Sequence, residues 1–277
     1  MKKLLVGVIS ALVVLVALPL FSAFEAHVIN VSATIENALS VNATALDFGT
    51  VFPQEHLKQP LTVQLSSSFL AESRVEDVEY FIRQKPKCAI TWDGGKSFDA
   101  ANTKTGHVNA GNNPATPNVR ETYWVDCGPA PRLLDEIKGE VWGVLPSLCE
   151  YLSKEAVTEV GRSPNDETQP SFHVPFKIFH GDNQATPDVV ETDWVYWKDT
   201  EGLLSKTRPI DPVDNWLIDL AVPCFGGHCA QDWADFVHSL NPAADPNLFI
   251  QPLENEHKVF GCDLWVEVSG VIPAPTI

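Results

Sequence analysis

Residue types that bind zinc stand close together in the last third of the chain. The segment Cys224-Phe-Gly-Gly-His-Cys229 offers two thiols and an imidazole, and His238 follows it. This spacing lacks the paired Cys-x-x-Cys pattern of structural zinc sites. The sequence also lacks His-Glu-x-x-His, which places two imidazoles beside a general base on one helical face in metallopeptidases. We therefore favour a disulfide in this segment and predict no metal ligands.

No motif for nucleophilic or phosphoryl-transfer chemistry is present. The sequence contains no Gly-x-Ser-x-Gly elbow, no Gly-rich phosphate loop and no dinucleotide fingerprint. Serine, histidine and aspartate residues alone do not define a triad, because any chain of this size contains them. We assign no catalytic residue and predict that the protein is not an enzyme.

Two loops carry oxygen ligands that calcium accepts. These are Gly111-Asn112-Asn113 and Gly181-Asp182-Asn183, with Glu121, Asp188 and Glu191 nearby. Their spacing matches no known calcium loop, and turns favour Asn, Asp and Gly for backbone reasons alone. We predict no cofactor and keep calcium as an alternative.

The N-terminus has the layout of an export signal. Met1-Lys2-Lys3 precedes an uncharged apolar run from Leu4 to Phe24. Because this run is also nearly long enough to span a bilayer, we predict that residues 1–26 are a signal peptide or an N-terminal membrane anchor, and we favour cleavage. No later stretch is long and apolar enough to cross a membrane, so membrane contact is expected only through this segment.

The cysteines and the charge agree with export. An even number of cysteines in an exported chain favours disulfides, and the sequence leaves their pairing open. The formal charge of −17 argues against a nucleic-acid partner, because phosphates would be repelled. The disulfide candidates, all downstream of the signal, are Cys88, Cys127, Cys149, Cys224, Cys229 and Cys262.

Period-two alternation predicts strands at both ends of the chain. The first predicted strand covers residues 28–35, where Ile29, Val31, Ala33 and Ile35 share one face. Further strands are predicted at residues 45–52, 61–65, 78–84, 216–222 and 259–271. Strands at both ends with irregular sequence between them predict a β-sandwich interrupted by a long insertion.

The predicted domain boundaries follow from this pattern. We expect the sandwich to comprise residues 27–90 and 209–277, and a loop-rich insertion to occupy residues 91–208. Helical spacing predicts short helices at residues 133–144, 148–154 and 231–240. Within the insertion, residues 113–126 resemble residues 183–196. We interpret this repeat as a duplicated hairpin, with a repeated ligand site as the alternative.

Several segments resemble a known family. Phe24-Glu-Ala-His-Val-Ile-Asn-Val-Ser-Ala-Thr-Ile-Glu-Asn37 and Leu46-Asp-Phe-Gly-Thr-Val-Phe-Pro53 are similar to the TasA/camelysin family of exported biofilm-matrix and surface-fibre proteins. Residues 149–154, 222–233 and 259–270 look like a cysteine-containing branch of it. The resemblance implies an all-β, jelly-roll-like antiparallel sandwich, here with one to three short helices. It also implies fibres in which the N-terminal strand of one subunit completes the sheet of its neighbour.

These observations favour a structural protein over a binding module. We expect a secreted, extracellular or cell-surface protein that self-associates, with Ile29, Val31, Ala33 and Ile35 as strand-donation candidates. Other surface or matrix proteins are alternative partners. The second hypothesis is a secreted module that binds carbohydrate, protein or calcium through the insertion loops. The third is a secreted hydrolase, an activity attributed to the camelysin side of the family.

Overall fold

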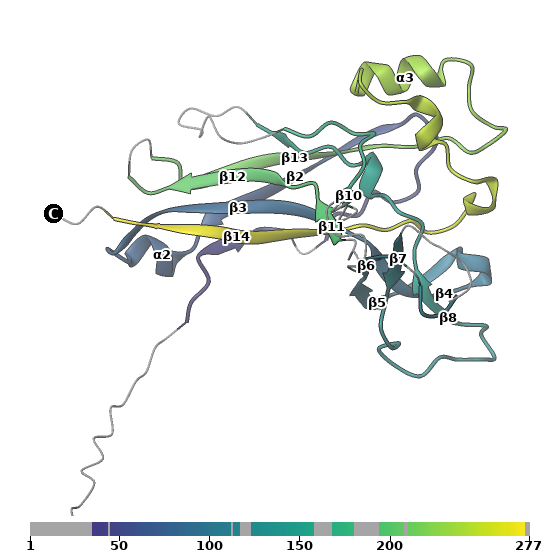
Figure 1. Cartoon of the computed structure of the whole chain (residues 1–277), viewed down its shortest axis with the longest axis horizontal. Coiled ribbons are helices and arrows are strands. Elements are labelled where there is room, and N and C mark those ends of the chain that lie inside the picture. Colours follow the sequence, from purple (N-terminus) through teal and green to yellow (C-terminus); the bar gives the residue numbers. More distant parts are fainter. Residues whose placement is uncertain are drawn as a thin grey trace, which may run out of the picture. The chain divides into compact units, whose positions relative to one another are not determined.

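The computed structural model describes residues 35–43, 45–111, 113–116, 123–157, 168–179, 194–207 and 210–274. The chain divides into two units, Met1–Ile35 and Glu36–Ile277, and all helices and strands named below belong to the second (Figure 1). The predicted signal segment and the donor candidates Ile29, Val31 and Ala33 lie outside the described residues. Among the described residues, no helix has the length and apolar character needed to cross a bilayer.

The described part of Glu36–Ile277 is mostly β-strand, with two short α-helices and several 3-10 turns. The helices are α2 (Ser67–Ala71) and α3 (Trp233–Leu240), and the 3-10 turns are η2 (Asp93–Gly95), η3 (Cys149–Tyr151), η4 (Pro246–Phe249) and η5 (Leu253–Asn255). The strands are β1 (Leu39–Val41), β2 (His56–Leu65), β3 (Val75–Lys85), β4 (Lys87–Trp92), β5 (Ser97–Thr105), β6 (His107–Ala110), β7 (Tyr123–Asp126), β8 (Val141–Val144), β9 (Glu155–Ala156), β10 (Phe176–Phe179), β11 (Trp194–Trp197), β12 (Thr200–Ser205), β13 (Val213–Ala221) and β14 (Asp263–Pro273).

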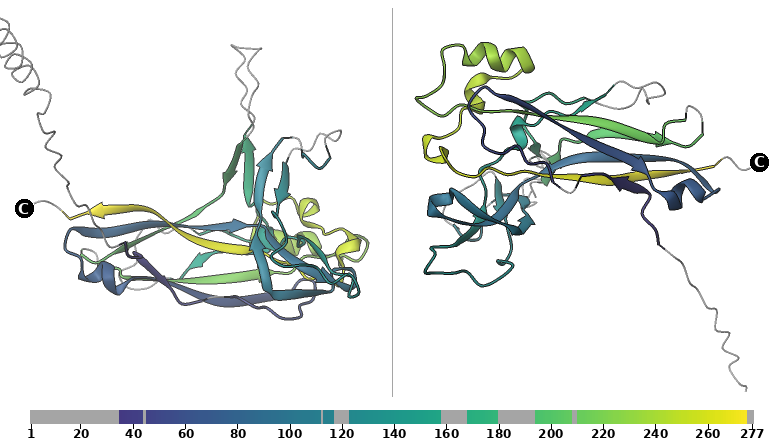
Figure 2. Two further views of the ribbon diagram at one scale, coloured as in Figure 1. Left: turned by 90° about the horizontal axis from the view of Figure 1, so that it is seen from below. Right: turned by 180° about the vertical axis from the view of Figure 1, so that it is seen from behind.

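Two antiparallel sheets form a sandwich (Figure 2). One sheet has the order β1-β2-β13-β9, and the other has the order β12-β3-β14. The predicted all-β antiparallel sandwich with short helices is therefore confirmed. Strands β9 and β12 come from residues 91–208, so the sandwich draws on sequence that we expected to lie in the insertion.

The core lies between the inner faces of these two sheets. Buried residues alternate along the central strands, as period-two patterning requires. They include Leu61, Val63 and Leu65 of β2, Val78, Tyr80 and Ile82 of β3, Leu204 of β12, and Trp216, Ile218 and Leu220 of β13. Burial of this apolar surface is the main force that holds the sheets together.

A buried polar contact crosses this core. The Tyr80 hydroxyl of β3 donates to the Asp214 carboxylate of β13 at 2.5 Å and accepts from the Trp216 indole N–H at 2.7 Å. All three side chains are buried. Buried polar groups are costly unless they are paired, so this contact fixes the alignment of the two sheets.

The remaining strands lie outside the sandwich. Strands β5, β4 and β8 form a three-stranded sheet, and the hairpins β6–β7 and β10–β11 form two-stranded ones. The two copies of the sequence repeat end in β7 and β11, so each copy supplies the second strand of a hairpin. The Tyr123 ring of one hairpin contacts the Phe176 ring of the other edge-on, with centroids 5.1 Å apart.

Two of the predicted helices and one predicted strand are wrong. Residues 133–144 form turns followed by β8, because Val141–Val144 pairs with β4 and Gly139 adopts a positive φ of 70°. Residues 148–154 contain only the 3-10 turn η3, after which the backbone follows β13. Residues 45–52 have no regular structure, because the Asp47 carboxylate accepts from the Gly49 N–H and turns the chain locally.

Other predicted elements are confirmed. Strands β2, β3, β13 and β14 cover the predicted residues 61–65, 78–84, 216–222 and 259–271 to within a few residues at their ends, and α3 covers most of residues 231–240. Strand β14 contains a register shift between Val268 and Gly270. Helix α2 was not predicted, because a five-residue helix carries too little periodic signal.

Removing one hydroxyl tests the cross-sheet contact. Tyr80→Phe keeps the ring and leaves the Asp214 carboxylate and the Trp216 N–H with one partner fewer. We expect the free energy of unfolding to fall by about 1–3 kcal/mol, measured by urea denaturation with the disulfides intact. Tyr123→Phe, at a half-exposed tyrosine, is the control and should change stability little. Equal stabilities of Tyr80→Phe and wild type would contradict the assigned role.

A glycine sets the approach of β12 to this contact. A Cβ at Gly202 would lie 2.3 Å from the Tyr80 ring, closer than packing allows. We expect Gly202→Ala to lower the free energy of unfolding by about 1–3 kcal/mol through overpacking. Gly143→Ala in β8 is the matched control, because a Cβ there has no neighbour within 4 Å. Equal effects of the two substitutions in the same urea assay would refute this explanation.

Candidate functional site

The six cysteines form three disulfides. Cys88 pairs with Cys127, Cys149 with Cys262, and Cys224 with Cys229. The first ties β4 to the end of β7, and the second ties η3 to the residue before β14. The predicted disulfides are therefore confirmed, and they indicate an oxidising compartment.

The segment that resembled a zinc site is closed by a disulfide. The Cys224–Cys229 bond occupies both sulfurs, so neither thiolate is available as a ligand. The His228 ring lies 3.7 Å from the Glu256 carboxylate, and both side chains are partly exposed. The described residues contain no group of three or more His, Cys, Asp or Glu side chains arranged to hold a metal ion.

The loops considered for calcium fall largely outside the described residues. Of the first loop, Gly111 and Asn113 are described, and the Asn113 side chain accepts from the Ala115 N–H. This is a local turn contact of the kind that explains Asn in loops without a ligand. The second loop, together with Glu121, Asp188 and Glu191, is not among the described residues. Calcium binding therefore has no support beyond the sequence.

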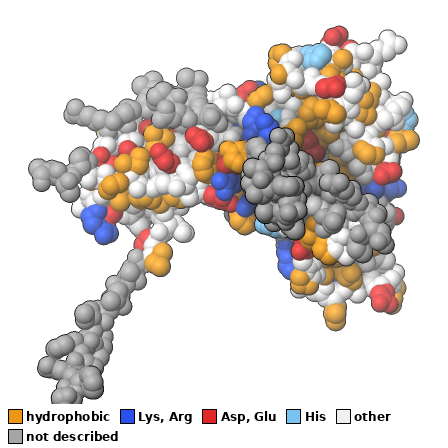
Figure 3. Space-filling model, viewed as in Figure 1, with side chains coloured by type: hydrophobic (Ala, Val, Ile, Leu, Met, Phe, Trp, Pro, Cys, Tyr) orange, Lys and Arg blue, Asp and Glu red, His pale blue; other side chains and the backbone are white. Residues whose placement is uncertain are grey.

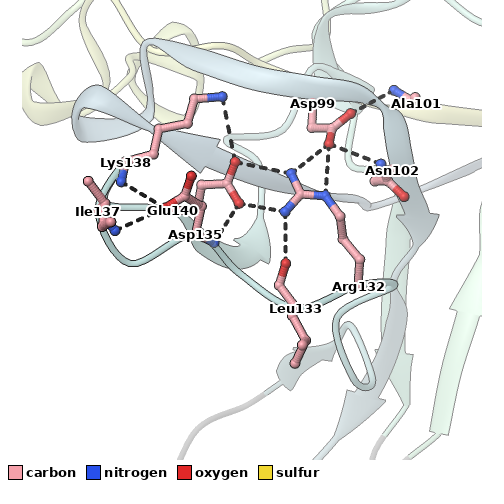
Figure 4. Close-up of polar contacts among 9 residues, drawn as sticks. All are labelled: Asp99, Ala101, Asn102, Arg132, Leu133, Asp135, Ile137, Lys138 and Glu140. Carbon is pink, nitrogen blue, oxygen red and sulfur yellow. Dashed lines mark hydrogen bonds and ion pairs between the residues drawn. The ribbon is translucent and has the colours of Figure 1, made fainter.

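An ion-pair network fixes the loop that follows the Cys88–Cys127 disulfide (Figure 4). Arg132 lies between two carboxylates, with nitrogen to oxygen distances of 2.8 Å to Asp99 and 2.6 Å to Glu140. The Glu140 carboxylate also accepts from the Asp135 N–H at 2.9 Å and pairs with Lys138 at 3.5 Å. Only 2% of the Glu140 side chain is exposed, so its charge depends on these partners.

The network determines the ionisation of Glu140 and the position of Lys138. Hydrogen bonds from Arg132, then from the Asp135 N–H, lower the pKa of Glu140 from 4.5 to about 2. The Lys138 ammonium lies 3.2 Å from the centre of the Trp92 ring, which adds a cation–π contact. The same loop leaves Leu133 and Ile137 almost fully exposed. We assign the network a structural role, because all its charges are paired within the loop and its neighbours.

Among the described strands of the sandwich, β14 has the longest unpaired edge. This strand of eleven residues lies at the end of its sheet, with β3 on one side. On its other side, none of the described strands pairs with it (Figure 1). An unpaired edge presents free N–H and C=O groups that another strand can bind. The edge of β14 is therefore the candidate site for strand addition.

Exposed aliphatic side chains accompany this edge. Leu264 and Val266 pack against the core, whereas Val268, Val271 and Ile272 in the second half of β14 are exposed. On the sandwich face seen in Figure 3, hydrophobic side chains are interspersed with acidic ones. Adding a strand here would bury aliphatic surface as well as satisfy backbone groups.

The other sandwich edges are shorter or better covered. Strand β1 has three residues, and residues 152–157 follow β13 along the edge that carries β9. Strand β12 has six residues, of which only Glu201 is exposed. Outside the sandwich, β8 is a four-residue edge strand with exposed Val141 and Val144. Of these edges, β14 offers the greatest length and the most exposed aliphatic residues.

Of the four residues predicted to lie on the donated strand, the structure describes only Ile35. Its side chain is 94% exposed. The candidates Ile29, Val31 and Ala33 lie outside the described residues, so the structure does not test whether the four act together. Sequence reasoning predicted β14 but not its edge position, because strand order depends on pairings between distant segments.

Sequence reasoning also missed a buried polar region near β9. Lys154 is fully buried and pairs through its backbone with the buried Gln169, and His173 is buried four residues after Gln169. No local pattern marks these residues, because a Ser-Lys-Glu sequence is ordinarily exposed.

Comparison of the chain with protein-family models, curated proteins and solved structures found no match.

The pH dependence of the Arg132 network follows from the lowered pKa of Glu140. A carboxylate with a lowered folded-state pKa stabilises the fold above its unfolded pKa, and this contribution is lost as the pH falls through the folded value. We therefore expect the loop to loosen between pH 4.5 and about pH 2. The NMR chemical shift of the Asp135 amide, which donates to Glu140, reports the transition.

The control for this titration is Glu140→Gln. This variant keeps the shape of the side chain and removes its titrating group, so the transition assigned to Glu140 should disappear. A wild-type midpoint at the ordinary glutamate value of 4.5 would contradict the proposed effect of Arg132 and the Asp135 amide.

Proposed function

We propose that this protein is an exported, non-catalytic structural component of the cell surface or extracellular matrix. Copies assemble into fibres when the N-terminal segment of one, with Ile29, Val31, Ala33 and Ile35 on one face, adds to β14 of the next. The observation that carries this proposal is the unpaired, aliphatic edge of β14. Residues 28–35 offer an alternating strand that such an edge binds.

The unit boundaries support donation to another copy. The sandwich unit begins at Glu36, so residues 28–35 are not part of it. An eight-residue strand spans roughly 26 Å. Residues 28–35 are therefore short enough to pair within the eleven residues of β14. Residues 28–35 carry no charged side chain, so pairing with β14 would bury no unpaired charge from the donor.

Export is supported by the N-terminal sequence and the disulfides. A signal-like segment at residues 1–26 precedes three disulfides, which persist in oxidising compartments. Signal cleavage would free residues 28–35 for donation, whereas a retained anchor would hold them at the membrane. The net charge of −17 would limit non-specific association between copies.

A binding module is the second candidate function. The two hairpins that contain the repeated sequence contact each other through Tyr123 and Phe176, and Phe176 contacts Trp197 with centroids 5.6 Å apart. Tyr196 of β11 is exposed. Aromatic residues on adjacent hairpins are typical of surfaces that bind carbohydrate or protein. This alternative does not require self-association.

Electron microscopy of two purified, oxidised chains tests assembly. One chain begins at His27, and the other begins at Glu36, which keeps β1 and the whole sandwich. We expect filaments only from the longer chain, because only it carries the donor strand. Monodisperse particles from both would contradict strand donation and favour the binding module.

Charged substitutions test the acceptor edge in the longer chain. Val268→Lys with Val271→Lys places two charges beside the proposed donor strand, and we expect the filaments to be lost. The matched control is Val141→Lys with Val144→Lys on β8, another exposed edge strand, which should still form filaments. Circular dichroism establishes that both variants are folded. Filaments from the β14 variant would rule out this edge as the acceptor.

A further inference from the structure

A polar region lies buried at one end of the sandwich interior. Gln84 follows Ile82 on the inner face of β3, and Thr200 lies at the start of β12. Both are fully buried, as is Lys154 just before β9, and Gln169 and His173 are also buried. Burial, the largest cause, lowers the pKa of His173 to about 3.

Lys154 and Gln169 are direct cross-strand neighbours. The Lys154 N–H donates to the Gln169 carbonyl and the Gln169 N–H donates to the Lys154 carbonyl, both at 2.8 Å. In such an antiparallel pair the two side chains project from the same face, with Cβ atoms about 4.5–5.5 Å apart. The two long side chains therefore start side by side in the same buried region.

The terminal nitrogens of both side chains are buried without hydrogen-bond partners. This holds for Nζ of Lys154 and Nε2 of Gln169 among the described residues. A buried donor without a partner is costly, and a charged one far more so. Burial, together with the charge of Lys198, lowers the pKa of Lys154 to about 7, against the opposing charge of Asp199. Much of the Lys154 amine is therefore neutral and nucleophilic near neutral pH.

The carbonyl side of the Gln169 amide has a hydrogen-bond donor. The Thr200 hydroxyl donates to Oε1 of Gln169 at 3.3 Å. A donor at this oxygen stabilises the negative charge that develops when a nucleophile attacks the amide carbon. The pair thus combines a neutral amine, an amide directly opposite it and a polarising donor, in surroundings that exclude water.

We propose that Lys154 and Gln169 form an intramolecular amide cross-link. Nζ of Lys154 attacks Cδ of Gln169, so the Nζ–Cδ bond forms and the Cδ–Nε2 bond breaks. One proton passes from the attacking nitrogen to the departing one, and Nε2 leaves as ammonia. The reaction needs no oxidant, reductant or further reactant, and it removes Nε2 and converts the Nζ amine into a neutral amide N–H.

The cross-link would join Lys154 and Gln169 covalently at the two ends of residues 155–168. It would keep these two residues together even when the hydrogen bonds between them open, as the disulfides do for other pairs of segments. Reducing agents do not cleave an amide, so this connection would survive conditions that open all three disulfides. The inference does not depend on fibre assembly.

Mass spectrometry of the reduced, denatured full chain tests the cross-link. We expect wild-type protein to weigh less than its sequence by the mass of one ammonia molecule, about 17 Da. Trypsin should fail to cut after Lys154, and residues 139–162 should be recovered covalently joined to residues 163–177. This branched peptide distinguishes the cross-link from ammonia loss at any other residue. Separate peptides of unmodified mass, with cleavage after Lys154, would overturn the proposal.

Three variants assign the roles of the residues. Lys154→Met should abolish the branched peptide, and Thr200→Val should reduce its fraction by weakening attack at Gln169. Lys96→Met, at an exposed lysine, keeps the nucleophile and should retain the cross-link. A cross-link to Gln169 that persists in Lys154→Met, or an unchanged fraction in Thr200→Val, would overturn the assigned role of that residue. The wild-type measurement decides the proposal even if Lys154→Met does not fold.

Discussion

The hydrogen bonds of the Tyr80 hydroxyl to Asp214 and Trp216 fix how the two sheets face each other. Apolar burial brings the two sheets together but does not determine how they are aligned, because the hydrophobic effect has no direction. The Tyr80 hydroxyl restricts the alignment, because it must lie within hydrogen-bonding distance of a buried carboxylate and a buried indole at once. Gly202 follows from this constraint, because β12 can pass the Tyr80 ring only without a side chain.

This arrangement closes the interior and leaves one long edge open. With β3 central in its sheet, β12 and β14 become the two edges. The Cys149–Cys262 bond anchors the start of β14. The second half of β14 keeps exposed aliphatic residues, and none of the described strands pairs with its outer edge. The proposed strand addition would use this outer edge of β14.

Local patterns predicted the parts of the fold that depend on local sequence. Strands β2 and β3 could be predicted because buried residues alternate with more exposed ones along much of each strand. Residues 45–52 have strand-forming side chains, but Gly49 at a φ of 68° and the Asp47 side chain turn the backbone. Residues 133–144 have helical spacing, yet β8 pairing and the Arg132 network outweigh that preference.

The candidate sites depended on contacts that sequence does not encode locally. Nothing around Lys154 indicates that its amine is buried, because Gln169 reaches it through a backbone pairing across a loop. The edge position of β14 follows from strand order, which joins residues nearly two hundred positions apart in sequence. The disulfide pairing was left open for the same reason. The sequence showed which residues could form strands and disulfides, but it did not show which distant residues they would pair with.

The most direct test of the account is whether the N-terminal segment binds β14. Hydrogen–deuterium exchange of the chain starting at Glu36 would be measured with and without a synthetic peptide of residues 27–35. Strand addition predicts slower exchange in Asp263–Pro273 and unchanged exchange in β8. Unchanged exchange in β14, or equal protection of β14 and β8, would contradict it.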